Sequence, residues 1–169
     1  KISSAPLTLE EVMDKLIEFH DQNLTVVRLH TGDPSIYGAI GEQIKILDER
    51  KIDFEVVPGV SSFTAACSSL KKEFTLPGIS QTVIVTRLAG RTPVPEKEDL
   101  ELLARHQCSM AIFLSVKDMK TVVKKLTAGY GSDQIPIAVV YKATWPDEKI
   151  IKGTLADIAE KVAAHKIEK

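Results

Sequence analysis

The chain has 169 residues, of which 44% are hydrophobic and 27% are charged, and its formal net charge at pH 7 is −1. This composition is typical of a globular protein with a hydrophobic core, and the length suits one domain or one domain and part of another. Acidic and basic residues are mixed along the chain and no apolar run approaches about 18 residues, so we expect neither a nucleic-acid surface nor a membrane span.

The first predicted element is a helix that begins after Thr8. Thr8 and Glu11 have the spacing of a capping box, in which each side chain accepts a hydrogen bond from the other's backbone. Apolar residues then recur on one helix face, and Asn23 is expected to end the helix. The apolar run over residues 25–30 predicts a buried strand.

Two glycine turns follow, each between a predicted strand and a predicted helix. The first is a Gly-Asp-Pro turn at residues 32–34, and the helix after it is expected to start at about Ile36 and run to about Arg50. The second turn, at residues 58–62, follows a short predicted strand over 54–57. Ligands of α/β proteins bind beyond the carboxyl ends of strands, so both turns are candidate binding loops.

The rest of the chain continues the alternation of strands and helices. The predicted elements are a helix over 62–70 with Ser61 as N-cap, a strand over 82–86, a loop over 90–95, a helix over 96–106, a strand over 110–114, a helix from Asp118 to about Gly129, a strand over 135–141, a turn over 145–148, a strand over 149–152, and a final helix opened by Gly153 and Thr154. This order predicts an α/β fold, and the late strand–turn–strand predicts a mixed sheet.

The residue types favour a binding site for a reactive cofactor over metal or nucleophilic catalysis. Cys67 and Cys108 are far apart without a metal or redox spacing, which indicates free thiols in a cytoplasmic protein. The four histidines are scattered, so no metal site is expected. Phosphate-binding glycine motifs and a Gly-x-Ser-x-Gly elbow are absent. What remains is backbone groups, hydroxyls and one carboxylate.

Several motifs, in order, resemble the tetrapyrrole methylase family. They are Gly32–Gly38, Val57–Ser62, Tyr141–Glu148 and Gly153–Leu155. Leu76-Pro77, Ser80–Thr82 and the Trp-Pro-Asp-Glu of residues 145–148 make the resemblance greatest to members that methylate C11 of precorrin-4 or cobalt-precorrin-4 in cobalamin biosynthesis. Whether the substrate carries cobalt stays open.

The resemblance implies a two-domain α/β architecture. Residues 1–60 would be the carboxyl-terminal part of an amino-terminal domain, and residues 61–169 a carboxyl-terminal domain. Family members begin with a further strand and a glycine- and proline-rich loop that forms part of the tetrapyrrole trough. This chain starts after that segment, so we expect a polypeptide of these residues alone to be inactive.

The resemblance also implies S-adenosylmethionine as cofactor, bound in the cleft between the domains and converted to S-adenosylhomocysteine by SN2 transfer of its methyl group. The residues that match cofactor-binding positions are Thr31, Gly32, Asp33, Ile36, Tyr37, Ser61, Ser62, Leu114, Ala143, Gly153 and Thr154. Leu114 and Ala143 match positions near the adenine, and Gly153 and Thr154 would complete that wall. No catalytic residue is assigned. A corrinoid precursor as substrate and a homodimer are further expectations.

Two alternatives remain at this stage. One is a family member that methylates a different ring position, against which the stretch from Lys142 to Glu148 argues. The other is a non-enzymatic module that only binds or dimerises, which the missing amino-terminal loop favours.

Overall fold

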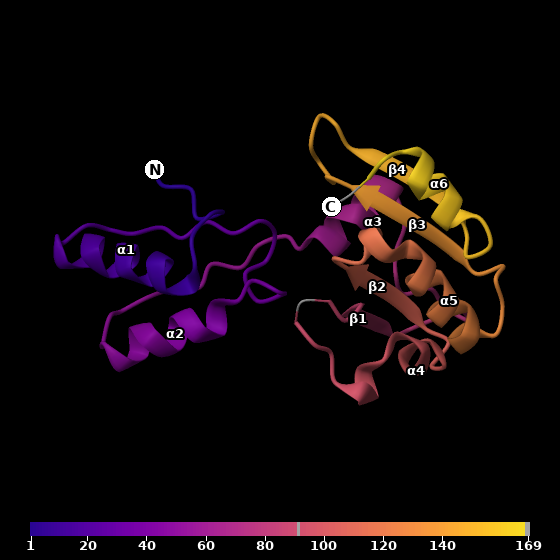
Figure 1. Cartoon of the computed structure of the whole chain (residues 1–169), viewed down its shortest axis with the longest axis horizontal. Coiled ribbons are helices and arrows are strands. Elements are labelled where there is room, and N and C mark those ends of the chain that lie inside the picture. The colour runs from indigo at the N-terminus through magenta and orange to yellow at the C-terminus, as the bar shows by residue number, and fades with distance from the viewer. Residues whose placement is uncertain (91, 168–169) are drawn as a thin grey trace. The chain divides into compact units, whose positions relative to one another are not determined.

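The computed structural model describes residues 1–90 and 92–167. Arg91, in the predicted loop over 90–95, lies outside the described residues. The chain divides into two compact units, residues 1–62 and residues 63–169, here called unit 1 and unit 2. We describe each unit by itself (Figure 1).

Unit 1 contains two helices, α1 (Leu9–Asp21) and α2 (Ile40–Glu49). The capping box of α1 is confirmed, because the Glu11 N–H donates to Thr8 Oγ1 over 3.3 Å and the Thr8 N–H donates to Glu11 Oε2 over 2.7 Å. Asn23 has a φ of 58° and follows the last turn, as predicted. Val12 and Met13 are buried on the apolar face of α1.

The prediction of strands over residues 25–30 and 54–57 is wrong, because the structure has no strand in either segment. Both segments lack regular secondary structure, and within residues 1–90 and 92–167 neither belongs to a hydrogen-bonded ladder. Their apolar side chains, such as Val27 and Val57, are exposed. A strand exists only with a partner, and the apolar pattern does not supply one.

The sequence predicts that the second helix starts near Ile36, but α2 starts at Ile40. Residues 34–37 form a turn, and Tyr37 and Ala39 have φ values of 56° and 52°, in the left-handed region that a right-handed helix cannot include. The apolar spacing therefore extended the helix prediction one turn too far.

Unit 2 holds the strands. Its elements, counting α3 whose first residue closes unit 1, are α3 (Ser62–Leu70), β1 (Val83–Arg87), η1 (Glu96–Glu98), α4 (Leu100–Ala104), β2 (Ser109–Phe113), η2 (Val116–Asp118), α5 (Met119–Tyr130), β3 (Pro136–Tyr141), β4 (Lys149–Thr154) and α6 (Ile158–Ala164). The predicted α/β class is confirmed. The prediction of one mixed sheet is wrong for the described residues: their strands form two separate two-stranded sheets, with β1 parallel to β2 and β3 antiparallel to β4.

Helix α5 lies at the centre of the core of unit 2. One buried cluster comprises Leu100, Ala104, Val122, Leu126 and Leu155, and a second comprises Met119, Ile151, Ile158, Val162 and Ile167. Val123 of α5 and Ile137 of β3 pack against both clusters. The two clusters therefore form one continuous core between the strands and helices of this unit.

Two helix boundaries in unit 2 differ from prediction. The helix expected over 96–106 is split into η1 and α4, because Asp99 takes an extended conformation and its Oδ1 accepts the Glu101 N–H over 2.9 Å as a new N-cap. Helix α5 does not stop at Gly129. It ends at Tyr130, and Gly131, with a φ of 73°, takes the left-handed C-cap position.

Gly129 has a packing role inside α5. A Cβ at this position would overlap the carbonyl oxygen of Glu101 and the Cβ of Ala104 in α4. The glycine therefore allows the backbones of α4 and α5 to approach closely.

Candidate functional site

Residues 31–38 and 58–62, here called the paired loops, lie against each other in unit 1. Asp33 connects them, because its Oδ1 accepts the Ser35 N–H over 2.8 Å and its Oδ2 accepts the Gly59 N–H over 3.1 Å. One carboxylate thus fixes its own turn and also a loop that lies 26 residues further along the chain.

Two glycines allow the close approach of the paired loops. A Cβ at Gly59 would overlap the carbonyl oxygen of Gly32. Gly32 itself has a φ of 87°, a conformation that side chains disfavour, and it lies against the backbone of Ser61 and Ser62. The predicted importance of both glycine turns therefore has a physical basis in backbone contact.

The hydrogen bonds at Asp33 also affect its ionisation. The Ser35 and Gly59 N–H groups stabilise the carboxylate and lower the pKa of Asp33 from its usual value near 3.8. Burial, with a smaller effect of Arg28, lowers the pKa of the neighbouring His30, so its imidazole is neutral at pH 7. The loops therefore carry a fixed negative charge beside an uncharged ring.

The structure brings all seven predicted residues of unit 1 into or beside the paired loops. Thr31 and Tyr37 are exposed, Ile36 is half-buried, Ser61 is buried, and Ser62 is the exposed first residue of α3. Ser61 occupies the N-cap position of that helix, as predicted. A helix N-terminus is a type of site that binds carboxylates, because its partial positive charge attracts anions.

In unit 2, Leu114 and Ala143 each follow the end of a strand. Leu114 comes directly after β2, is 82% exposed and has a φ of 55°. Ala143 comes two residues after β3 and is half-buried. Figure 1 shows the arrowheads of β2 and β3 pointing the same way, so the carboxyl ends of the two strands face the same side of unit 2.

Helix α3 contacts both of these strand ends. Its Phe63 packs against Phe113, the last residue of β2, with ring centroids 6.2 Å apart. Its Ser69 Oγ donates to Glu148 Oε2 over 2.8 Å, in the turn that follows β3. The helix is therefore a common support for the segments that carry Leu114 and Ala143.

The turn over residues 142–148, here called the Ala143 turn, has an unfavourable backbone. Lys142 and Thr144, on either side of Ala143, have φ values of 50° and 71°. Such conformations cost a non-glycine residue on the order of 1–3 kcal/mol. They persist only where surrounding interactions hold them, and sequence reasoning alone did not foresee them.

Several interactions close the Ala143 turn. Lys142 Nζ pairs with Asp147 Oδ2 over 2.5 Å and lies 5.7 Å from the centre of the Trp145 ring. The Thr144 N–H donates to Glu148 Oε2 over 2.7 Å. The donors at Thr144 and Ser69 lower the pKa of Glu148, and Lys142 lowers that of Asp147. Both carboxylates are therefore charged at neutral pH.

Gly153 and Thr154 do not lie with Ala143. They belong to β4 and pair with Ile137 and Pro136, whereas the Ala143 turn follows Tyr141 at the other end of the hairpin. Ile137, the partner of Gly153, lies four residues before Tyr141, which is roughly 13 Å along the strand. The prediction that they open the last helix is also wrong, because α6 begins at Ile158.

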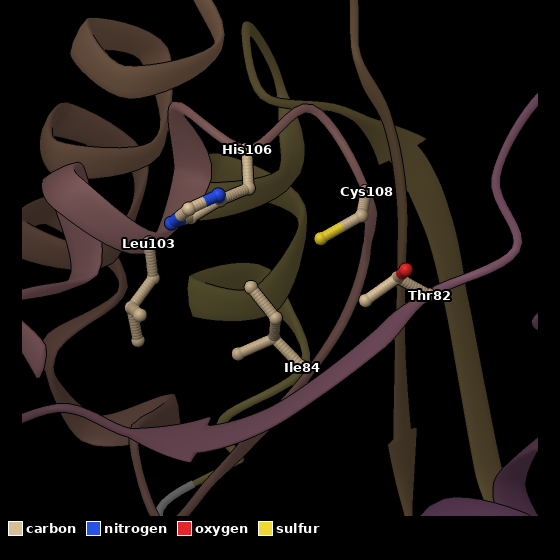
Figure 2. Close-up of a pocket in the computed structure, with 5 residues that line it drawn as sticks. All are labelled: Thr82, Ile84, Leu103, His106 and Cys108. Atoms are coloured by element: carbon tan, nitrogen blue, oxygen red, sulfur yellow. The ribbon is translucent and has the colours of Figure 1, made fainter.

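A hollow of about 340 Å³ lies elsewhere in unit 2 (Figure 2). It is lined by Thr82, Ile84, Leu103, His106 and Cys108, and Figure 2 shows Ile84 with Leu103 on one side and Cys108 and Thr82 on the other. None of these residues carries a carboxylate, and Thr82 alone among them belongs to a motif, Ser80–Thr82. We therefore take two candidate regions, each within its own unit: the paired loops of unit 1, and the segments that follow β2 and β3 in unit 2.

The described residues contain no cluster of three or more histidine, cysteine or acidic side chains that could hold a metal ion. Across residues 1–90 and 92–167, no helix has the length and apolar character required to cross a membrane.

The model of the family described as Tetrapyrrole (Corrin/Porphyrin) Methylases matches residues 2–159. The match includes the paired loops, the end of β2 and the Ala143 turn. The chain therefore belongs to the tetrapyrrole methylase family, and the fold predicted from the motifs is confirmed.

Among curated proteins, the chain is 58% identical over 167 residues to the cobalt-precorrin-4 C(11)-methyltransferase of Methanocaldococcus jannaschii. The alignment covers 99% of this chain and 64% of that protein, so the chain spans less than two thirds of its relative's length.

Solved structures show the same relationship. A cobalt precorrin-4 methyltransferase, described as a cobalamin biosynthetic enzyme, matches with a TM-score of 0.95 and 45% identity over 99% of this chain and 70% of that one. The uroporphyrin-III C-methyltransferase of Thermus thermophilus, complexed with S-adenyl homocysteine, matches with a TM-score of 0.75 and 26% identity over 91% of this chain and 67% of that one.

One contact of the site, between Ser69 and Glu148, does not follow from the sequence. Ser69 belongs to none of the matching motifs, and Glu148 is only the last residue of the motif Tyr141–Glu148. Their hydrogen bond spans 79 residues, and no local pattern indicates such a contact.

Proposed function

We propose that this chain is part of an S-adenosylmethionine-dependent methyltransferase that methylates C11 of precorrin-4 or cobalt-precorrin-4 in cobalamin biosynthesis. The 58% identity to a cobalt-precorrin-4 C(11)-methyltransferase over 99% of the chain carries this proposal. The fold match to a cobalt precorrin-4 methyltransferase supports it.

The paired loops are our candidate for the cofactor's amino-acid part. Thr31, Gly32 and Asp33 offer backbone and side-chain polar groups, and Ile36 and Tyr37 add an apolar wall beside them. The start of α3 at Ser61 and Ser62 suits the carboxylate of the methionine portion, because helix N-termini attract negative charge. The S-adenyl homocysteine in the Thermus relative supports this choice of cofactor.

Leu114 and Ala143 are our candidates for the adenine. The exposed Leu114 side chain can cover one face of the base, and main-chain groups of Ala143 can read its edge. Gly153 and Thr154 are not included, because β4 places them at the far end of the hairpin.

The chemistry of the reaction belongs to the cofactor. The sulfonium of S-adenosylmethionine supplies an electrophilic methyl group. This chain's residues would bind and orient the cofactor, and such positioning is the contribution that a protein makes to an SN2 methyl transfer. Asp33 acts through position, because each of its carboxylate oxygens already accepts a backbone N–H.

We further propose that the two units correspond to part of an amino-terminal domain and to a carboxyl-terminal domain, and that the protein is a homodimer that acts on a corrinoid precursor. A cytoplasmic location is supported by Cys67 and Cys108, which are both free and half-buried.

The first test is calorimetric titration of S-adenosylhomocysteine into the 169-residue chain. We expect saturable binding, and we expect Asp33→Ala to weaken it at least about tenfold, because the loops lose the group that joins them. Asp48→Ala, at an exposed residue of α2, is the matched control and should change nothing. Absence of binding by the unaltered chain would contradict the cofactor assignment.

The second test concerns the substrate. A protein in which this chain is extended to the full length of its relatives is incubated with methyl-labelled S-adenosylmethionine and either precorrin-4 or cobalt-precorrin-4. Label at C11 in one of these products is the expected result and identifies the form used. Label at another ring position would instead support a different methylase of the family.

A further inference from the structure

We propose that Glu148 is a positioning residue of the cofactor site: its carboxylate holds the Ala143 turn in the conformation that presents the main chain of Ala143. This inference rests on the proposed function, in which Ala143 contacts the adenine. It concerns residues of unit 2 only.

The first observation is that the Ala143 turn does not adopt its conformation by local preference. Ala143 lies between two non-glycine residues with positive φ, 50° at Lys142 and 71° at Thr144. Side chains disfavour this region, so an isolated peptide of the same sequence would leave it. Something outside the backbone must stabilise the turn.

The second observation is that one carboxylate oxygen of Glu148 accepts two hydrogen bonds, one from within the turn and one from a residue far away in the sequence. Oε2 accepts the Thr144 N–H over 2.7 Å, which fixes one of the two unfavourable residues. The same oxygen accepts Ser69 Oγ over 2.8 Å, which fastens the turn to α3. A carboxylate oxygen occupied in this way acts on Ala143 through the turn and not by contact with a ligand.

The third observation is that other interactions of the turn join residues within it or adjacent to it, as when Lys142 Nζ lies 5.2 Å from the centre of the Tyr141 ring. The Trp145 N–H donates to the Lys142 carbonyl, and Lys142 pairs with Asp147. These interactions close the turn on itself, whereas the Ser69 bond to Glu148 ties it to α3. Because Phe63 of α3 also packs on Phe113, next to Leu114, Glu148 places Ala143 on the same support as the residue proposed for the other side of the adenine.

The experiment uses the single tryptophan of the chain, Trp145, which lies in this turn and is 60% exposed. Time-resolved fluorescence anisotropy measures its local motion, calorimetry measures affinity for S-adenosylhomocysteine, and urea unfolding followed by circular dichroism measures overall stability. All three are performed on the 169-residue chain.

Four variants separate the contributions. Glu148→Ala should add a fast component to the Trp145 anisotropy decay and weaken S-adenosylhomocysteine binding about tenfold, with little change in the unfolding midpoint. Ser69→Ala, which removes one link only, should weaken binding about threefold. Glu148→Gln keeps an acceptor oxygen and should restore both signals. Glu160→Ala, at an exposed glutamate of α6, is the control and should resemble the unaltered chain.

Three results would overturn the proposal in different ways. If Glu148→Ala leaves the anisotropy unchanged, Glu148 does not hold the turn. If the anisotropy changes but the affinity does not, the turn is structural and the cofactor assignment survives. If the unaltered chain does not bind S-adenosylhomocysteine, the proposed function fails and the positioning role fails with it, whatever the anisotropy shows.

Discussion

In unit 1, Val27 and Leu29 are 74% and 79% exposed, whereas Ile151 on a strand of unit 2 is 3% exposed. The three residues belong to segments that look alike in sequence, since each contains a short apolar run. In unit 2 the run pairs with β3 and packs beneath α6, while in unit 1 the run has no partner among the described residues. An apolar run therefore shows that a segment has side chains suited to burial, but it does not show whether the folded chain buries them.

Two leucine substitutions test this contrast in burial, and one of them should cause a large loss of stability. Leu126→Ala, in the core of unit 2, should lower the free energy of unfolding by about 2–5 kcal/mol, because it removes buried methyl groups and leaves a cavity. Leu29→Ala, at an exposed position of unit 1, should change it by less than about 0.5 kcal/mol. Urea unfolding measures both, and equal losses would show that the burial of the two units does not differ.

A pair of helix glycines tests the packing within each unit. Gly129→Ala should lower the stability of unit 2 by about 2 kcal/mol, because overpacking against α4 exceeds the helix-propensity gain of roughly 1 kcal/mol. Gly41→Ala in α2 meets nothing within 4 Å and should stabilise its helix by about 0.5 kcal/mol. Trp145 fluorescence reports the first change and far-ultraviolet circular dichroism the second. A stabilising Gly129→Ala would contradict the observed contact between α4 and α5.

The paired loops of unit 1 are held together by hydrogen bonds and close backbone contact. The substitution Gly59→Ala tests whether this contact is needed for binding. Its Cβ would overlap the carbonyl oxygen of Gly32, so we expect the loops to separate and S-adenosylhomocysteine to bind at least about tenfold more weakly. The unfolding midpoint of unit 2 should not move. Gly90→Ala is the control, because a Cβ added there meets no atom of the described residues within 4 Å beyond the adjacent residues. Unchanged affinity in Gly59→Ala would mean that the contact of the loops is not required for binding.

A pH titration tests the hydrogen bonds of Asp33 in the paired loops, and its effect on stability is expected to be small. The folded-state pKa of Asp33 lies below its ordinary value of 3.8, because the Ser35 and Gly59 N–H groups stabilise the charged form. Its stabilising contribution is therefore complete above about pH 3.8 and is lost as the pH falls through the lowered pKa. The amide NMR signals of Ser35 and Gly59 should titrate with a midpoint below 3.8, and Asp33→Asn should abolish that step. A midpoint above 3.8 would show that the bonds are not formed in solution.

The sequence predicted the parts of the site that depend on local chemistry. The capping box at Thr8, the N-cap position of Ser61 and the antiparallel hairpin after β3 follow from short-range patterns, and the structure agrees with them. The motifs also identified the family, which the comparison with known proteins confirmed. The assignment of residues to the cofactor remains a prediction.

The sequence did not predict what depends on distant partners. Gly153 and Thr154 belong to a matching motif, and the strand register, which no local pattern gives, places them at the opposite end of the hairpin from Ala143. Gly129 seemed to be a helix stop, and it proved to be the site of contact with α4. In both cases the decisive neighbour is far away in sequence.

By itself, the sequence determined the α/β class, the two glycine loops, most helices of the chain and the family to which it belongs. These features follow from periodicity, capping and motif spacing, which act over a few residues. Tertiary structure alone decided that Asp33 joins the two loops, that Glu148 fastens the Ala143 turn to α3, and that the apolar runs of unit 1 form no strand. The reason is physical: a hydrogen bond or a ladder needs two partners, and a local pattern describes only one of them.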